Sequence, residues 1–333
     1  MSDMNKVTGN PRRLGVSWFS AIDWQLKGFY FKKRIVIASS CTIDPAGVAD
    51  HYNELDLFYR EIWGEHVHHG LWLTGNEDPA LAVVQLVQLV AAEAGITTGT
   101  RVCDIGCGYG AAARYLARQK GAEVTGVTIS VSQHAYARKV DSSGNPNYLL
   151  SDWLATELPP ESFDAAFAIE SSEHMPDKVE FFSRAARILK TDGRLVVCSW
   201  LAGQTPGGSQ KKWLLEPICR EGRIPHLLSS EELVTAAERA GFATLNQNDI
   251  SNQVSRTWSI VIARFLKGLI SVPRYRSFLF DPELHNRIFA ATIIRLWLAY
   301  RVRAIGYGIF TFAKKALFAL FVIFSLYGLA GIS

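Results

Sequence analysis

The sequence has 333 residues, of which 48% are hydrophobic and 11% aromatic; this is ordinary for a globular α/β protein and long enough for one large domain with additions or two small domains. Its five cysteines are scattered without a C-x-x-C pair, which predicts reduced thiols in a cytosolic compartment and gives little support to metal binding. The net charge of +4 conceals two basic flanks, residues 1–40 and 254–315, whose interleaved aromatic and aliphatic residues favour an anionic membrane surface over nucleic acid.

The N-terminal segment, residues 14–38, is aromatic and basic and has two interpretations. It is either a helix packed on the domain or an interfacial segment whose aromatic side chains lie among lipid headgroups. The first apolar stretch is short, follows Pro11 and contains Asp23, so no secretory signal peptide is predicted.

A histidine-rich loop follows a predicted helix over residues 45–64, which begins at a proline. His66, His68 and His69 lack the i, i+4 spacing of helical metal ligands, and no second ligand cluster accompanies them in the sequence. We therefore predict no metal site and interpret the loop as a polar cover over a small-molecule site.

Strands and helices alternate through the middle of the chain. This alternation predicts a doubly wound, mostly parallel α/β sheet, in which ligands bind at the carboxyl ends of the strands. The predicted helices cover residues 79–94, 111–119, 131–140 and 177–190, and the predicted strands cover residues 102–105, 122–128, 148–150, 163–170 and 194–200.

The stretch RVCDIGCGYG, residues 101–110, places three glycines between a predicted strand and a predicted helix. Glycines let a backbone approach a ligand closely, and the helix N-terminus offers unpaired N–H groups. Asp104 ends the strand, where a carboxylate suits the ammonium group of S-adenosylmethionine (SAM) better than the two phosphates of NAD. The other strand ends bring Thr128 to Ser130, Asp152 with Trp153, and Glu170 to His174 to the same crevice.

The C-terminal third adds a cap and an uncharged tail. Residues 203–229 form an insertion that contains glycine and proline, and a helix over 230–240 and a strand over 242–249 follow it. Residues 254–303 are aromatic, basic and helical, and their basic stripes are either solvated faces or part of a lid or membrane-facing surface.

A last predicted strand over residues 307–315 ends in two lysines. The 18 residues that follow, 316–333, carry no charge, and a membrane span needs roughly 20 apolar residues. The tail therefore either associates with a membrane or packs on the domain or on an oligomer partner.

Three motifs resemble class I SAM-dependent methyltransferases: the glycine stretch, GVTIS at residues 126–130 and IESSEHMPDK at residues 169–178. With IWGEHVHHG at residues 62–70, they are similar to tocopherol O-methyltransferases, which group with sterol C-methyltransferases. The resemblance covers residues 45–315 and implies a seven-stranded, mostly parallel Rossmann-like sheet with a helical cap. The expected organisation is an extension over residues 1–40, a methyltransferase domain over 41–315 with its cap from 203–229 and 254–303, and a hydrophobic tail over 316–333.

The resemblance also implies roles for individual residues. Asp104 and the glycine backbone hold the methionine end of SAM, residues 128–130 flank the ribose and adenine, and Asp152 accepts from the adenine amino group. Glu170, Glu173 and His174 stand where the methyl group faces the acceptor, although Glu170 and His174 could instead be structural. The implied cofactor-binding residues are Asp104, Gly106, Cys107, Gly108, Gly110, Thr128, Ile129, Ser130, Asp152 and Trp153.

The predicted function is methyl transfer from SAM to a lipophilic small molecule, a prenylated phenol or quinone or a sterol-like isoprenoid, on the cytoplasmic side of a membrane. Glu173 or His174 is then the candidate general base for a phenol, whereas a carboxylate and aromatic rings would stabilise the carbocation formed from an alkene. Two alternatives stay open: a soluble methyltransferase of a polar metabolite, which uses its tail for dimerisation, and a non-catalytic SAM-binding membrane protein. A nucleic-acid substrate is not expected, because no Asn-Pro-Pro-Tyr-type motif follows the fourth strand.

Overall fold

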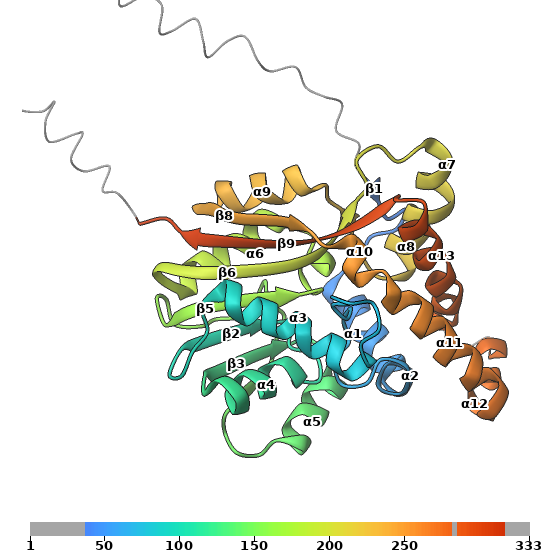
Figure 1. The fold of residues 1–333 in the computed structure, drawn as a ribbon, viewed down its shortest axis with the longest axis horizontal. Helices are drawn as coiled ribbons and strands as arrows, with labels where there is room; N and C mark the ends of the chain where they lie inside the picture. The colour runs from blue at the N-terminus through green and yellow to red at the C-terminus, as the bar shows by residue number, and fades with distance from the viewer. Residues whose placement is uncertain (1–36, 282–284, 317–333) are drawn as a thin grey trace, which may run out of the picture. The chain divides into compact units, whose positions relative to one another are not determined.

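The computed structural model describes residues 37–281 and 285–316, which all belong to one compact unit of the chain. The strands of its main sheet are β2 (Arg101–Ile105), β3 (Glu123–Thr128), β4 (Asn147–Leu150), β5 (Phe163–Ile169), β6 (Leu189–Ala202), β8 (Phe242–Asp249) and β9 (Ile305–Lys314). Their order is β4-β3-β2-β5-β6-β9-β8, and only β9 runs against the others (Figure 1). This confirms the predicted seven-stranded, mostly parallel sheet.

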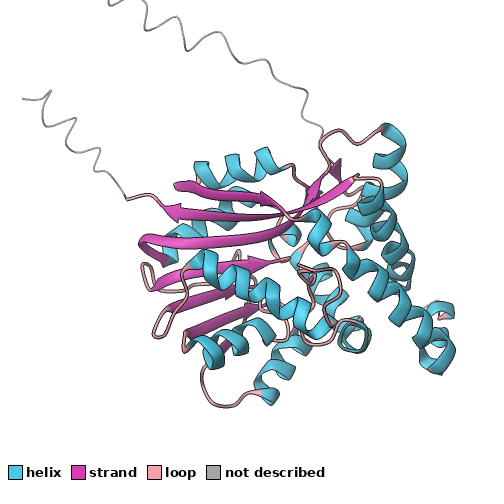
Figure 2. Cartoon of the chain, in the orientation of Figure 1, coloured by secondary structure: helices cyan, strands magenta, loops and turns pink. Residues whose placement is uncertain are grey.

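Helices cover both faces of the sheet, as Figure 2 shows. One face packs against α3, α4 and α5 and the other against α6 and α9, so two apolar cores flank the strands. Several of these helices begin at side-chain caps; the carboxylate of Asp78, for example, accepts a hydrogen bond from the backbone N–H of Ala80. Their bounds are α3 (Pro79–Ala94), α4 (Ala111–Lys120), α5 (Val131–Val140), α6 (Lys178–Ile188) and α9 (Ser230–Arg239).

Strand β5 shows why the sequence forms a central strand. Successive side chains of a strand point to opposite faces of its sheet, so a strand between two cores is apolar over its buried length. Ala165 and Phe167 pack into the core beneath α3, and Ala166 and Ala168 pack into the core beneath α6. The strand ends beside the helical cap, where the next residue, Glu170, lies.

The predicted helix over residues 45–64 is two helices. The first, α1, spans Pro45–Glu54, and the second, α2, spans Asp56–Ile62. Leu55 leaves the helical geometry, with φ −90° and ψ 5°, and its side chain is buried in the core beside the glycine-bearing face. The break is therefore set by tertiary packing.

The end of the N-terminal segment, residues 14–38, is a strand and not the predicted helix. Its last residues are extended: β1 (Ile37–Ala38) pairs antiparallel with β7 (His226–Leu227), so the predicted helix does not reach them. The rest of the segment lies outside the described residues, as do residues 317–333 of the predicted tail.

Strand β6 begins earlier than predicted. Helix α6 ends at Ile188, and the chain turns directly into the sheet at Leu189, which pairs with Phe163 of β5. The predicted turn over residues 191–193 is an irregularity inside the strand, where Asp192 takes a positive φ of 61°. Complete burial of Leu189 in the core explains why the strand starts there.

A helical cap stands at the end of the unit where the parallel strands end (Figure 1). Both segments predicted to form it contribute, and α13 packs against α8 of the first segment and α11 of the second. The cap elements are α7 (Gly208–Gln210), a π-helical turn η2 (Lys211–Leu215), α8 (Glu216–Glu221), α10 (Ser251–Val254), α11 (Arg256–Ser271), α12 (Pro273–Phe280), the 3₁₀ turn η3 (His285–Ile288) and α13 (Phe289–Arg301).

Two basic residues from the predicted stripes fasten this cap. The guanidinium of Arg264 on α11 donates to the backbone oxygen of Ile62 at the end of α2, at 2.6 Å. Arg295 on α13 forms an ion pair with the buried carboxylate of Glu221 on α8. Across residues 37–281 and 285–316, no helix combines the length and apolar character needed to cross a membrane.

Candidate functional site

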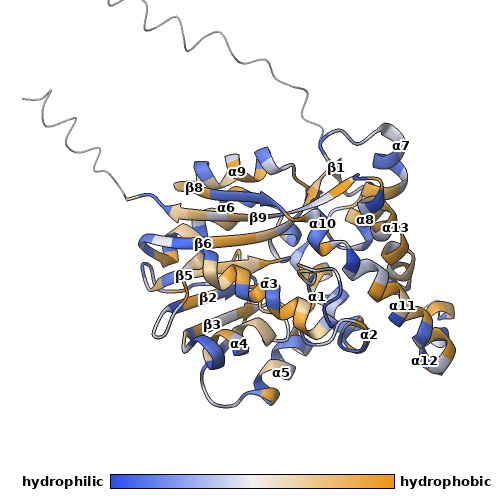
Figure 3. Cartoon of the chain, viewed as in Figure 1, coloured by the Kyte–Doolittle hydropathy of each residue, from blue (hydrophilic) through white to orange (hydrophobic). Residues whose placement is uncertain are grey.

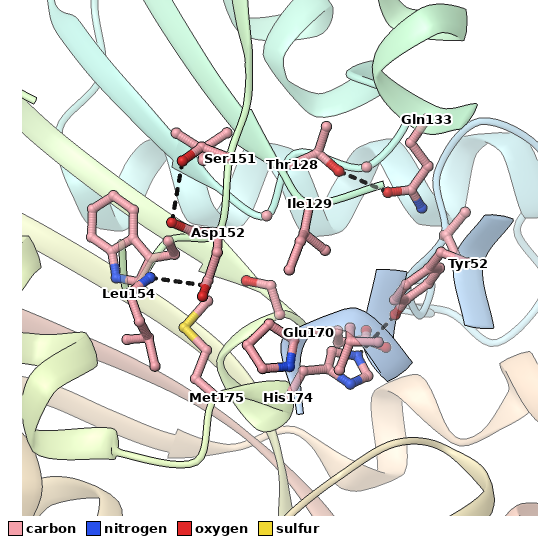
Figure 4. Close-up of a pocket in the computed structure, with 18 of the residues that line it drawn as sticks. Tyr52, Thr128, Ile129, Gln133, Ser151, Asp152, Leu154, Glu170, His174 and Met175 are labelled. Atoms are coloured by element: carbon pink, nitrogen blue, oxygen red, sulfur yellow. Dashed lines mark hydrogen bonds between the residues drawn. The ribbon is translucent and has the colours of Figure 1, made fainter. Parts of the chain in front are cut away.

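A cavity of about 770 Å³ opens at the carboxyl ends of β2, β3 and β5; we call it the glycine cavity. Many of the residues predicted from the sequence line it (Figure 4). They are Gly106, Gly108, Thr128, Ile129, Asp152, Trp153, Glu170 and His174, and they are joined by Tyr52, Gln133 and Met175, which the sequence did not single out. A smaller cavity, which we call the Asp104 cavity, adjoins it at Gly106 and Gly108 and is also lined by Asp104, Cys107, His66 and His68.

Gly106 shapes the boundary between these two cavities. Its φ is +84°, and a Cβ placed there would lie 2.2 Å from the Cβ of Ser171, so only glycine fits. The Ser171 hydroxyl donates to the backbone oxygen of Ile105, which fixes the loop after β5 against the end of β2. Gly108 also has a positive φ, of +54°, and faces more open space.

Asp104 is a buried carboxylate with an unused acceptor. Its Oδ2 atom has no hydrogen-bond partner among the described residues. Burial raises the pKa of Asp104 from its ordinary 3.8 to about 8. An unpaired buried carboxylate is costly, and a cationic group in the cavity would remove that cost.

The histidine loop covers the Asp104 cavity as an uncharged chain of hydrogen bonds. Nδ1 of His68 lies 2.8 Å from the backbone oxygen of His69, so this nitrogen donates, and Nε2 of His68 then accepts from Nδ1 of His66 at 3.1 Å. Burial lowers the pKa of His66 to about 3 and also lowers that of His68. This geometry agrees with a polar cover; in the part of the chain that the structure describes, no group of three His, Cys, Asp or Glu residues could hold a metal ion.

Polar groups line the part of the glycine cavity that lies beside the ends of β3 and β4. The Thr128 hydroxyl donates to Oε1 of Gln133 at 2.9 Å, which leaves the Gln133 amide N–H groups as donors toward the cavity. Oδ1 of Asp152 accepts from the backbone N–H of Leu154 at 3.0 Å. The indole of Trp153 is buried and donates to the backbone oxygen of Phe181, so it forms part of the wall rather than a polar contact.

Two predicted cofactor-binding residues lie outside the lining of both cavities. The Ser130 hydroxyl is fully buried, donates to Asn53 at 2.7 Å and caps α5 by accepting from the backbone N–H of Gln133. Gly110 caps α4 with a φ of +75°, and a Cβ there would lie 2.6 Å from the ring of Tyr148. Both residues thus support the site from behind.

A third cavity, of about 530 Å³, lies on the other side of Tyr52 and His174; we call it the aromatic cavity. It shares Tyr52, Val67, Glu170 and His174 with the glycine cavity, so the two are neighbours. Its remaining lining residues are Tyr59, Trp63, His69, Glu173, Trp200, Gly222, Ile224 and Trp258. The three predicted catalytic residues therefore all line the aromatic cavity, and Glu170 and His174 also line the glycine cavity.

Glu170 is held in place by donors from three parts of the chain. Its Oε1 accepts from the backbone N–H of His69 at 2.7 Å and from the Tyr307 hydroxyl at 2.8 Å, and its Oε2 accepts from the indole of Trp200 at 3.0 Å. Burial favours the neutral acid, but the electrostatic interaction with His69 and the hydrogen bonds from His69 lower the pKa of Glu170 to about 2. A carboxylate so fully engaged is suited to fixing the site and poorly suited to moving a proton.

Glu173 is buried and less heavily engaged. Its Oε1 accepts from the backbone N–H of Trp200 at 2.7 Å, and its Oε2 lies 3.3 Å from the hydroxyl of Ser172. Burial raises the pKa of Glu173 to about 7, and the neighbouring charge of Glu170 acts in the same direction. A carboxyl with that pKa exchanges its proton near neutral pH.

His174 forms a defined pair with Tyr52. Its Nδ1 lies 2.9 Å from the backbone oxygen of Arg223 and must therefore carry the proton, so its Nε2 accepts from the Tyr52 hydroxyl at 2.9 Å (Figure 4). Burial lowers the pKa of His174 to about 4. The imidazole is thus neutral at pH 7, and the pair stands where the glycine and aromatic cavities meet.

Lys178 holds the turn that carries Glu173 and His174. Its buried ammonium donates to the backbone oxygens of Ser172 at 2.7 Å, Glu173 at 3.0 Å and Met175 at 2.6 Å. These bonds hold the 3₁₀ turn η1 (Ser172–His174). Burial lowers the pKa of Lys178, so the clamp persists only because the three carbonyls solvate the charge.

Exchange of Lys178 for methionine is expected to lower the free energy of unfolding by about 2–4 kcal/mol, because methionine keeps much of the stem but leaves three carbonyls without their donor. Urea denaturation at pH 7 measures the change. The matched control is Lys139→Met on the exposed end of α5, which is expected to change stability by less than about 0.5 kcal/mol. Equal midpoints for the two variants would show that the turn does not depend on Lys178.

Several residues of the site were not predicted from the sequence as contributors. Tyr52 lies inside a predicted helix with no signal of its own, and Trp200 is one aromatic residue at the end of a strand. His69 was seen only as part of the covering loop, although its Nε2 is buried without a hydrogen-bond partner among the described residues and its ring lines the aromatic cavity. Lys178 ends the motif at residues 169–178, which is the one signal that could have marked it.

Comparison with known proteins adds independent information. Residues 41–274 match the family model for mycolic acid cyclopropane synthetase. The chloroplastic tocopherol O-methyltransferase of Arabidopsis thaliana is 28% identical over 267 residues, which cover 72% of this chain and 77% of that protein. The sterol 24-C-methyltransferase of Yarrowia lipolytica is 30% identical over 215 residues, which cover 62% of this chain and 56% of that protein.

Among solved structures, the cyclopropane synthase MmaA2 from Mycobacterium tuberculosis is similar to this chain with a TM-score of 0.72 and 22% identity. The match covers 83% of this chain and 100% of that chain. Similarity at that level of identity shows the fold alone.

Proposed function

We propose, because this chain belongs to the mycolic acid cyclopropane synthetase family and is a SAM-dependent methyltransferase, that it methylates a lipophilic small molecule. The chain falls within the group of tocopherol methyltransferases, sterol methyltransferases and cyclopropane synthases. The observation that carries the proposal is the aromatic cavity, whose apolar wall faces a polar corner formed by Glu173 and His174. Such a cavity suits a molecule with a reactive polar or unsaturated head and an apolar body.

SAM is the cofactor, and it supplies a methyl group bound to positively charged sulfur. The residues of the Asp104 cavity fit its methionine end, because the unpaired Oδ2 of Asp104 would accept from the ammonium group. Gly106 and Gly108 let the backbone approach, with Cys107 beside them. We assign the adenosine to the glycine cavity, with Gln133 and Asp152 as its polar partners.

The chain's own residues would do two things for the reaction. They align the acceptor with the methyl group across the junction of the two cavities, and they exclude water from it. For a phenol acceptor, Glu173 or the neutral His174 takes the proton. For an alkene acceptor, the rings of Trp200 and Trp258 and the nearby carboxylates stabilise positive charge.

We assign Glu170 a positioning role. Its carboxylate accepts from the loop of His69, from Trp200 on β6 and from Tyr307 on β9, so it ties the walls of the aromatic cavity together. Glu173 and His174 remain the two candidates for the group that moves a proton.

Incubation with methyl-labelled SAM and a total lipid extract is expected to place label in the organic phase, because the aromatic cavity selects an apolar acceptor. Scintillation counting after phase separation measures it, and excess S-adenosylhomocysteine serves as the control that suppresses transfer. Label only in the aqueous phase, with a metabolite extract present, would favour the polar-metabolite alternative. No transfer to either extract would favour the non-catalytic alternative.

A further inference from the structure

We propose that helices α11, α12 and α13 dock on an anionic lipid bilayer and admit the acceptor from it into an apolar cavity that leads to the methyl-transfer site. The proposal rests on the proposed function and names the surface through which it acts. Three features support it: the positive charge of these helices, their exposed apolar side chains, and the neighbouring cavities beneath them.

The three helices carry charge of one sign. From residue 250 to residue 280, and again from residue 285 to residue 316, the sequence contains no aspartate or glutamate. Lys267, Arg274, Arg276 and Arg301 are exposed on these helices. An anionic membrane surface attracts such a cluster, and a neutral one does not.

Apolar side chains are exposed beside these cations. Leu266 and Ile270 lie four residues apart on α11, and Ile294 and Leu298 lie four residues apart on α13, so each pair shares one helix face. Ile270 and Phe280 are each 80% exposed, the highest values among the large apolar residues that the structure describes. Figure 3 shows this apolar character along α11, α12 and α13.

The cations sit close to the apolar residues. The guanidinium of Arg276 donates to the backbone oxygens of Leu269 and Ile270 at the end of α11, at 2.6 and 3.1 Å. The guanidinium of Arg301 lies over the ring of Trp297, 4.6 Å from its centroid. Apolar side chains flanked by arginines in this way match the boundary between acyl chains and headgroups.

A narrow apolar cavity lies between these helices and α2. It shares Tyr59 and Trp63 with the aromatic cavity, which in turn shares Tyr52 and His174 with the glycine cavity. The three cavities therefore form a series from the cap to the SAM site. The lining of the apolar cavity is Leu55, Phe58, Tyr59, Ile62, Trp63, Phe265, Phe278, Ala290 and Ile293.

The three cavities explain why a methyltransferase would dock through these helices. An acceptor with a long apolar body is held in the bilayer and must leave it without exposing that body to water. The proposed path starts at the cavity between the docking helices, where the body of the acceptor would lie among Phe58, Phe265 and Phe278 while its head faced Glu173 and His174 beyond Tyr59 and Trp63.

Sedimentation with vesicles tests the docking face directly. The full chain is expected to bind vesicles of 70% phosphatidylcholine and 30% phosphatidylglycerol at least about tenfold more tightly than vesicles of phosphatidylcholine alone. The double variant Leu266→Asp/Ile270→Asp is expected to lose at least about tenfold of that binding, because it places two negative charges in the apolar face. Its shift in melting temperature with S-adenosylhomocysteine should be unchanged, which shows that the SAM site is intact.

The matched control is Val140→Asp/Leu245→Asp, which adds the same charges at residues 41% and 53% exposed on α5 and β8. Equal binding to both kinds of vesicle, or an equal loss in the two double variants, would overturn the proposal. A dimer that dissociates only in the α11 variant would also overturn it, because a second copy would then cover this face.

The lipid-labelling reaction separates this proposal from the proposed function. The α11 double variant is expected to label a detergent-dispersed lipid extract as the unmodified chain does and to lose at least about tenfold in rate when the same extract is presented in the anionic vesicles. An equal rate in both presentations would overturn docking while leaving the lipophilic acceptor intact. Absence of label with the unmodified chain in detergent would overturn the proposed function instead, and vesicle binding would still decide the docking face.

Discussion

Asp104→Asn is expected to weaken SAM binding at least about 100-fold at pH 7, because the amide cannot ionise to pair with the ammonium group of SAM and replaces one acceptor oxygen by a donor. The shape of the side chain is kept, so the glycine turn should remain. Isothermal titration with SAM measures the loss. The control is Asp164→Asn, which lies on β5 at a partly exposed carboxylate paired with Lys190 and is expected to leave SAM binding unchanged.

The same exchange is expected to change how the stability of the ligand-free protein depends on pH. The folded pKa of Asp104, about 8, lies above its ordinary value of 3.8, so between these values the folded protein keeps a proton that the unfolded chain has lost. Stability from this group therefore falls as pH rises from about 4 to about 8. Urea denaturation at pH 5 and pH 8 should show a smaller difference in Asp104→Asn than in the unmodified protein. Equal differences, or SAM binding within about threefold of normal, would contradict the assignment of Asp104.

Methyl transfer is expected to become faster with rising pH through about 7 if Glu173 takes the proton, because its carboxyl must be ionised to act as a base. His174 has a pKa of about 4 and is already neutral above pH 5, so it produces no such rise. Glu173→Gln is expected to lower kcat at least about 100-fold and to remove the rise. The measurement is kcat/KM for label transfer from pH 5.5 to pH 9.

His174→Ala distinguishes the two candidates. If Glu173 is the base, this variant keeps the rise near pH 7 and loses rate only through the missing contact with Tyr52. If His174 is the base, Glu173→Gln keeps most of its turnover and His174→Ala does not. A loss below about tenfold in both variants would remove both residues from the role of general base. SAM affinity serves as the control for Glu173→Gln, because Glu173 lines neither the glycine cavity nor the Asp104 cavity.

The sheet could be predicted because its signals are local. Alternation of apolar strands with capped helices sets the order of the elements, and the glycine stretch after β2 places the carboxyl end of the sheet. The break at Leu55 and the pairing of Ile37 with Leu227 could not be predicted in this way. Both depend on contacts between residues far apart in the sequence, which no short window contains.

The candidate site also contains residues that local signals predict and residues whose role depends on distant contacts. Asp104, Gly106 and Asp152 were predicted because each lies at or just beyond the carboxyl end of a strand, and the structure brings all three to the two adjoining cavities. Gly110 and Ser130 belong to the same motifs but support a helix start, since one contacts Tyr148 and the other Asn53. Their neighbours in space, rather than their place in the motif, decide whether they can reach a ligand.

The protonation of the turn η1 is also set by residues far away in the sequence. The proton on Nδ1 of His174 is fixed by the backbone of Arg223, and Nε2 by Tyr52, 122 residues earlier in the chain. The pKa of Glu173 depends on burial beneath Trp200 and the cap. The sequence could name these two candidate residues, but it could not rank them.

The position of β9 has a consequence for the order in which a newly made chain matures. This strand is the last described one in the sequence, yet it lies inside the sheet, between β6 and β8. Until the ribosome has released residues 305–314, β6 presents an open edge, and Tyr307 is missing from the donors that hold Glu170. The part of the sheet that carries the glycine and Asp104 cavities can therefore form early during synthesis, whereas the contacts that hold Glu170 beside the aromatic cavity are completed only after residues 305–314 have emerged.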